Sequence, residues 1–103
     1  MVERIRNVSQ TIGTDVEVVS EEQHKPNIRS VIQIVNTSLG GQKITISPAD
    51  EAENGKGIVL SVGGFYQDSQ ESGYKPTQRR ITAISDLADG EIAIHERVLS
   101  EGA

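Results

Sequence analysis

The feature that most constrains the fold is an alternation of apolar and polar residues that recurs between residues 28 and 98. Side chains of a β-strand point to opposite faces in turn, so a period of two residues predicts strands with one buried face. The segments that show this period are 28–35, 43–47, 58–62, 80–85 and 91–98. Apolar residues never recur at helical spacing, so we expect no helix longer than one turn.

Turn residues separate these strands, most clearly in "NTSLGGQ" at 36–42 and "DLADG" at 86–90. Short strands about ten residues apart with glycine-rich turns are typical of antiparallel sandwiches and barrels. The sequence therefore predicts an all-β fold, a small antiparallel β-sandwich or barrel of jelly-roll type. One or two further strands are expected within 1–27 and 65–79.

Strand 91–98 illustrates how the faces are assigned. The outward positions are Glu91, Ala93, His95 and Arg97, and the inward positions are Ile92, Ile94 and Val98. His95 is thereby interpreted as an exposed strand residue.

The first 27 residues are mostly polar, and "DVEVV" at 15–19 is the only part that alternates. Two interpretations are open: a flexible tail, or an extended N-terminal arm whose Val16, Val18 and Val19 complete a sheet of a neighbouring subunit. On the second interpretation residues 1–27 are arm and connector, and residues 28–103 are a single sandwich domain.

Length and charge exclude several classes of protein. A chain of 103 residues supports one core. Ten basic against fifteen acidic residues give a net charge of −5, which disfavours nucleic-acid binding. No apolar run approaches the ~20 residues of a transmembrane helix, and the N-terminus lacks the apolar region of a secretory signal. We therefore expect no nucleic-acid or membrane partner.

The sequence contains no catalytic or metal-binding motif. Cysteine is absent, and neither His24 nor His95 accompanies a nucleophile motif. The acidic segment 50–55 fits a calcium loop at its glycine, but a ligand position falls on Ala52 and the final glutamate position falls on Ser61. We expect no enzyme activity, no metal and no cofactor.

The three aromatic residues, Phe65, Tyr66 and Tyr74, fall within ten positions of one another. One interpretation is structural: Phe65 closes one end of the sandwich and the tyrosines pack beneath their own loop. The other is a contact patch, because tyrosine supplies rigid amphipathic area at interfaces.

The order of segments "IRSVIQIVNTS", "ITIS", "GIVLSVGGFYQDS", "RITAISD" and "GEIAIHER" resembles small all-β structural proteins of phages and related viruses. In such proteins an "I.I.N.S" strand leads to an "I.I" strand, a "G(I/V).L..G" segment, an aromatic loop, an "I.AI" strand and a terminal "I.(I/V).E" strand. The resemblance covers residues 28–98, about two-thirds of the chain.

The resemblance implies a non-enzymatic virion protein, made in the host cytoplasm, that decorates or cements a capsid or forms part of a spike. Its partners would be further copies of itself, the major capsid protein, or both. The alternative from a different class is an adhesin-like binding module that recognises a glycan or a receptor protein through the 65–79 loop. A binding module should be monomeric and depend on Tyr66 and Tyr74, whereas a virion protein should self-associate or bind a lattice.

Overall fold

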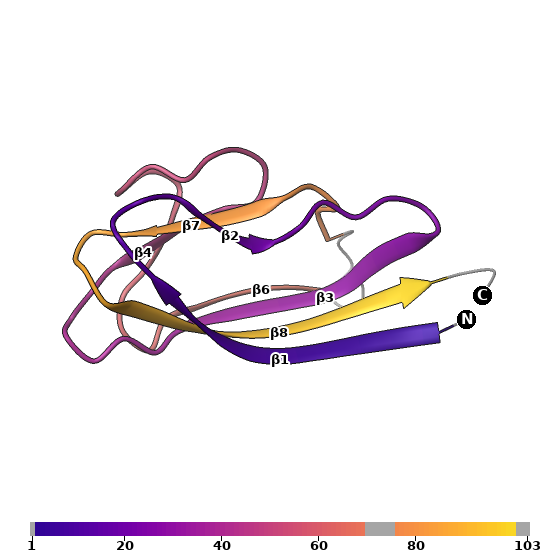
Figure 1. Cartoon of the computed structure of the whole chain (residues 1–103), viewed down its shortest axis with the longest axis horizontal. Helices are drawn as coiled ribbons and strands as arrows, with labels where there is room; N and C mark the ends of the chain where they lie inside the picture. The colour runs from indigo at the N-terminus through magenta and orange to yellow at the C-terminus, as the bar shows by residue number, and fades with distance from the viewer. Residues whose placement is uncertain (1, 70–75, 101–103) are drawn as a thin grey trace.

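The computed structural model describes residues 2–69 and 76–100, which form a sandwich of two antiparallel four-stranded sheets (Figure 1). The first sheet has the strand order β1-β8-β3-β6 and the second has the order β2-β7-β4-β5. In chain order the strands are β1 (Val2–Ile12), β2 (Glu17–Ser20), β3 (Asn27–Asn36), β4 (Ile44–Ser47), β5 (Ile58–Leu60), β6 (Phe65–Ser69), β7 (Ile81–Ser85) and β8 (Gly90–Ser100). This confirms the predicted all-β sandwich.

The core lies between the two sheets and consists mainly of isoleucine. Burying each such side chain contributes roughly 1.5–3 kcal/mol. The fully buried members are Ile12, Ile32, Ile34, Ile44, Ile46, Ile81 and Ile92. All except Ile12 come from segments whose alternation predicted a strand.

All five predicted strands are present, as β3, β4, β5, β7 and β8, and no boundary is shifted by more than two residues. The expected strand at 15–19 is β2, displaced toward Ser20. The polar segment 65–79 contributes β6, which pairs with β3 from Val31 to Val35.

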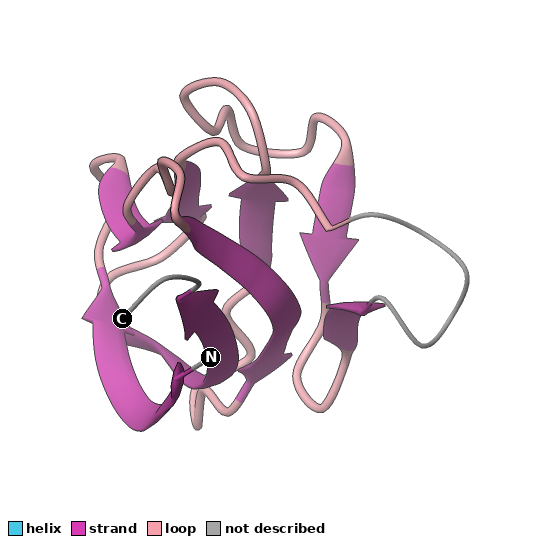
Figure 2. Cartoon of the chain, turned by 90° about the vertical axis from the view of Figure 1, so that its right-hand side faces the viewer, coloured by secondary structure: helices cyan, strands magenta, loops and turns pink. Residues whose placement is uncertain are grey.

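The expectation of an extended N-terminal arm does not hold in this structure. Strand β1 pairs with β8 along its whole length, from Val2 opposite Ser100 to Ile12 opposite Gly90. The first and last described residues of the chain therefore lie side by side, and we call this pair the paired chain ends (Figures 1 and 2). The physical reason is that β8 offers β1 eleven residues of unbroken register, and Ile12 adds a fully buried side chain.

The turn between β7 and β8 lies in the predicted turn segment 86–90, and its last two residues have different roles. Asp89 carries the positive φ of 63°, whereas Gly90 is required by packing. A Cβ atom at Gly90 would lie 2.8 Å from the Ile12 carbonyl oxygen and 2.8 Å from Ile44 Cδ1. Gly90 thus allows β1, β8 and β4 to approach closely where the two sheets meet.

Candidate functional site

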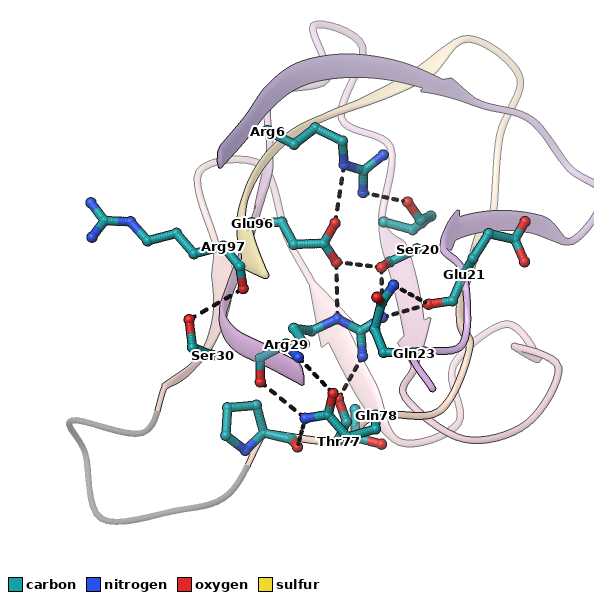
Figure 3. Close-up of polar contacts among 12 residues, drawn as sticks. Arg6, Ser20, Glu21, Gln23, Arg29, Ser30, Thr77, Gln78, Glu96 and Arg97 are labelled. Atoms are coloured by element: carbon teal, nitrogen blue, oxygen red, sulfur yellow. Dashed lines mark hydrogen bonds and ion pairs between the residues drawn. The ribbon is translucent and has the colours of Figure 1, made fainter. Parts of the chain in front are cut away.

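A buried ion pair between Arg29 of β3 and Glu96 of β8 lies inside the sandwich (Figure 3). The pair lies toward the end at which Val2 is opposite Ser100. Arg29 Nε donates a hydrogen bond to Glu96 Oε2 at 2.9 Å. The Arg29 side chain is 0% exposed and that of Glu96 is 7% exposed. Together with Ser20 and Arg6, which bind the same carboxylate, we call this cluster the Arg29–Glu96 centre.

Every N–H group of the Arg29 guanidinium has an acceptor, which is what a buried arginine requires. Nε donates to Glu96. One terminal nitrogen donates to the Thr77 and Arg79 carbonyl oxygens, and the other donates to Ser20 Oγ at 2.6 Å and to the Glu21 carbonyl oxygen at 2.8 Å. Arg29 therefore joins β3 to β2 and to the segment that leads into β7.

The Glu96 carboxylate is equally well bound. Oε1 accepts from Arg6 Nε at 3.2 Å, and Oε2 accepts from both Arg29 and the Ser20 hydroxyl. Arg6 also donates to the Val19 carbonyl oxygen at 2.9 Å. One buried and one partly exposed arginine therefore share a single carboxylate, which leaves the centre with a formal charge of +1.

Sequence reasoning missed this centre, although part of the signal was present. Glu96 follows Ile92 and Ile94 at the spacing of two residues that marks the inward face of β8. The alternation alone therefore predicts that its side chain points inward. The inward direction of Arg29 could not be predicted from the alternation. A register shift between Arg29 and Val31 turns Arg29 into the interior, and such a bulge leaves no alternation to detect.

The Gln78 side chain completes this region by pairing with the Arg29 backbone. Its Oε1 accepts from the Arg29 N–H at 2.6 Å, and its Nε2 donates to the Arg29 carbonyl oxygen at 2.9 Å. Among the residues that the structure describes, β6 pairs with β3 only between Val31 and Val35, and the Gln78 amide takes the place of a neighbouring strand at Arg29. Buried backbone groups at the bulge are thereby satisfied.

The arrangement holds the fold together and offers no reactive group. Ser20 is 3% exposed, and its hydroxyl is committed to Glu96 and Arg29. The described residues contain no group of three or more histidine or acidic side chains placed to hold a metal ion. Nor do they include a helical segment with the length and apolar character needed to cross a bilayer.

The exposed edge of β1 is the second candidate site. Within the described residues β1 pairs only with β8, so its other edge presents unpaired backbone groups along eleven residues. The edge contains no proline, glycine or bulge. Val2, Ile5 and Val8 are 48%, 53% and 41% exposed along it. Long regular edges of this kind readily accept another strand.

The edge of β2, in contrast, is covered by side chains of β1. Arg6 donates to the Val19 carbonyl oxygen, and Gln10 Nε2 donates to the Val18 carbonyl oxygen at 3.0 Å. Of the valines proposed as interface residues, Val16 and Val18 are partly exposed, but Val19 belongs to the core at 2% exposure. Val19 therefore cannot present its side chain to a partner in this structure.

The structure separates the aromatic residues proposed as a contact patch. Phe65 is 61% exposed, whereas Tyr66 is half-buried and packs against the core. Burial raises the pKa of the Tyr66 phenol, and the nearby Asp68 carboxylate raises it further. Tyr74 lies outside the described residues. Phe65 and Tyr66 occupy opposite faces of β6, so these two side chains do not form one patch.

The outer face of the first sheet carries a shallow groove of about 410 Å³ over β1, β8 and β3. Its polar members include Asn7, Gln33 and His95. Arg97 Nε donates to His95 Nε2 at 3.2 Å, which leaves His95 Nδ1 to donate to Asn7 Oδ1 at 2.6 Å. Asn7, His95 and Arg97 are therefore hydrogen-bonded in a row across the face.

One loop presents an isolated apolar side chain at the end of the sandwich away from the chain ends. Leu39, between β3 and β4, is 100% exposed. The loop itself is held by side chains: Asn36 Nδ2 donates to the Gln42 carbonyl oxygen at 2.8 Å, and Gln42 Nε2 donates to the Ala88 carbonyl oxygen at 2.9 Å. Leu87, in the neighbouring β7–β8 loop, is 53% exposed.

Comparison with known proteins yields a similarity of fold. No family model matches the sequence, and no curated protein matches it. The chain is similar to a solved structure from Bacillus endospore appendages, described as a family of disulfide-linked pili, with a TM-score of 0.56 and 13% identity. The similarity covers 94% of this chain and 83% of that chain. At this level of identity the similarity establishes the β-sandwich fold alone.

Proposed function

We propose that this protein is a non-enzymatic structural subunit that joins neighbouring subunits by strand addition at the edge of β1. The observation that carries the proposal is the contrast between two edges of the same sandwich. Strand β2 has its edge carbonyl groups bound by Arg6 and Gln10, whereas β1 is the longest edge and has no such cover among the described residues. An edge left open over this length is expected to serve pairing.

The Arg29–Glu96 centre supports a structural role. It commits the buried Ser20 hydroxyl, the buried carboxylate and all Arg29 donors to contacts within the chain. A catalytic carboxylate or hydroxyl must be free to bind a substrate, whereas Ser20 and Glu96 are buried and already hydrogen-bonded within the chain. The centre also fixes β1 to the sandwich through Arg6, which holds the open edge in a defined place.

We further propose that the assembly is a virion, in which the chain decorates or cements a capsid or forms part of a spike. The support is the resemblance of residues 28–98 to small all-β phage structural proteins. On this proposal the partners are further copies and the major capsid protein, and the protein is made in the host cytoplasm. The similar appendage protein supports an assembly role for the fold, but disulfide linkage does not transfer, because this chain has no cysteine.

The second candidate function is a binding module that contacts a glycan or a receptor protein. The fully exposed Leu39 and the largely exposed Phe65 favour it, because exposed apolar side chains on ordered elements are suited to partner contact. In that case the protein should be monomeric, and the edge of β1 should be dispensable.

Solution mass tests the main proposal. Sedimentation velocity of the wild type over a range of concentrations should show association. Ile5→Lys on β1 should shift the population toward monomer, because a lysine on an edge opposes strand addition. Val59→Lys, at a 40% exposed position of the edge strand β5, is the matched control and should associate like the wild type. A monomer at every concentration, or equal effects of both lysines, would contradict the proposal.

A further inference from the structure

We infer that the strand that pairs with β1 is β1 of a second copy, antiparallel across a two-fold axis at Asn7. The inference rests on the proposed function, and it specifies the partner and the register. It makes one continuous sheet from the β6-β3-β8-β1 order of each copy. In a symmetric contact of this kind the same surface serves both subunits.

Strand length selects the partner. β1 has eleven residues, whereas the other edge strands have five in β6, four in β2 and three in β5. Pairing with any of those would leave most of the β1 edge without hydrogen-bond partners. Of the edge strands in the described part of the chain, only a second β1 is long enough to cover the edge from end to end.

The alternation of side chains restricts the register. A shift by one residue would place outward side chains beside inward ones, so the axis must pass through a residue. With the axis at Asn7, Val2 lies opposite Ile12 of the second copy and all eleven residues are paired. An axis at Val8 would leave Val2 and Glu3 without partners.

Repulsion between like charges disfavours the registers in which the axis lies on the N-terminal side of Asn7, at Arg6 or Ile5. An axis at Arg6 would place two arginines directly opposite each other, and an axis at Ile5 would place Arg4 opposite Arg6 of the second copy. Like charges directly opposite on neighbouring strands are destabilising. With the axis at Asn7, Arg4 lies opposite a glutamine and Arg6 lies opposite Val8. The partly exposed Ile5 and Val8 then gain cover in both copies.

The contact is small by the standard of stable interfaces, so association is expected to depend strongly on concentration. A disulfide between the two copies would hold such a weak dimer together for measurement. Because the chain has no cysteine, an introduced cysteine can pair only with its counterpart in the second copy. Directly opposed residues have Cα atoms about 4.5–5.5 Å apart, within the range of a disulfide. Asn7→Cys should therefore form a disulfide-linked dimer under mild oxidation.

Ser9→Cys is the matched control for the trap, because it lies on the same face at the next outward position. In this register Ser9 faces Ile5 of the second copy, and the two Ser9 positions are about 13 Å apart. That separation is too large for a disulfide. Efficient cross-linking of Ser9→Cys with none at Asn7→Cys would overturn the register.

A charge pair at Val8 tests the same register without covalent chemistry. Val8→Lys places a lysine opposite Arg6 twice and should raise the dimer dissociation constant about fivefold. Val8→Glu places a glutamate opposite Arg6 twice and should lower it about fivefold. If the axis passed through Val8, both substitutions would oppose like charges and both would weaken the dimer.

The outcomes separate the inference from the proposed function. A wild type that associates, with cross-linking at Asn7→Cys and opposite effects of the two Val8 substitutions, supports both. A wild type that associates without these signatures overturns the two-fold pairing and leaves assembly through another register or edge. A wild type that stays monomeric at all concentrations overturns both.

Discussion

Arg29 is the residue whose environment does most to fix the geometry around the paired chain ends. Its guanidinium has acceptors for all of its donors, drawn from β2, β8 and the segment before β7. Burying a charge is costly unless it is paired and fully hydrogen-bonded. The centre meets that condition, so replacing the Glu96 counter-charge of Arg29 should lower the free energy of unfolding substantially.

Glu96→Gln should destabilise the protein by about 3–5 kcal/mol, because it leaves the buried guanidinium without its counter-charge and directs an amide NH₂ at arginine donors. Urea unfolding measures the change. Glu91→Gln, the same substitution at an exposed position of β8, should lie within about 0.5 kcal/mol of the wild type. Equal effects of the two substitutions would contradict the role given to the centre.

We expect the ionisation of Tyr66 to lower the free energy of unfolding at alkaline pH. Burial and Asp68 raise the pKa of its phenol, so the folded state disfavours ionisation. Its contribution to stability should be complete below the unfolded pKa of about 10 and be lost as pH rises through the higher folded value. Unfolding measured from pH 9 to 12 should show this decline in the wild type, and Tyr66→Phe should lack that part of it.

At the scale of elements, β1 behaves as part of the sandwich and not as an appendage. Deleting residues 1–27 would remove β1 and β2 together with the buried Ile12, Val19 and Ser20. We expect that truncation to unfold the protein, as far-ultraviolet circular dichroism would show. A folded truncated chain would mean that the remaining strands form a stable core alone.

A pair of point substitutions tests the placement of β1 without removing it. Ile12→Ala should cost about 2–5 kcal/mol, because Ile12 is fully buried where β1 approaches the second sheet. Ile5→Ala, on the same strand at 53% exposure, should cost less than about 1 kcal/mol. Chemical denaturation of the two variants gives the comparison, and similar small costs would indicate that β1 is detached in solution.

The strands that sequence reasoning identified share one property: they bury an alternating row of isoleucine, valine or leucine. β1 lacks that row because it lies at an edge and exposes most of both faces, with Ile12 as its only buried residue. Its place is set by pairing with β8, a contact between the two ends of the chain. Arg29 escaped detection for a different reason, since the bulge beside it reverses the alternation.

The molecule as a whole measures 43 × 22 × 22 Å. The Arg29–Glu96 centre lies toward the end of the sandwich at which Val2 pairs with Ser100, whereas Leu39 lies in the loop after β3, at the other end. Two kinds of contact are therefore separated in space: strand pairing along β1, and apolar contact at the β3–β4 loop. Which of them drives association is open to a direct measurement.

Leu39→Ser should change neither stability nor solution mass if association proceeds through β1. The side chain is fully exposed, so its replacement should lie within about 0.5 kcal/mol of the wild type. Sedimentation at matched concentrations provides the mass. If Leu39→Ser lost association while Ile5→Lys associated like the wild type, the contact would lie at the β3–β4 loop, which favours the binding module.

The complete satisfaction of the Arg29–Glu96 centre also restricts how the sequence can change over generations. A lineage that loses Glu96 alone leaves the fully buried Arg29 without a counter-charge, and one that loses Arg29 alone leaves the buried Glu96 with only the partly exposed Arg6. Selection for folding disfavours both intermediates. Replacing both by well-packed apolar residues carries little cost. Positions 29 and 96 should therefore covary among descendants of this chain, and an alignment of relatives, once assembled, should contain both charges or neither.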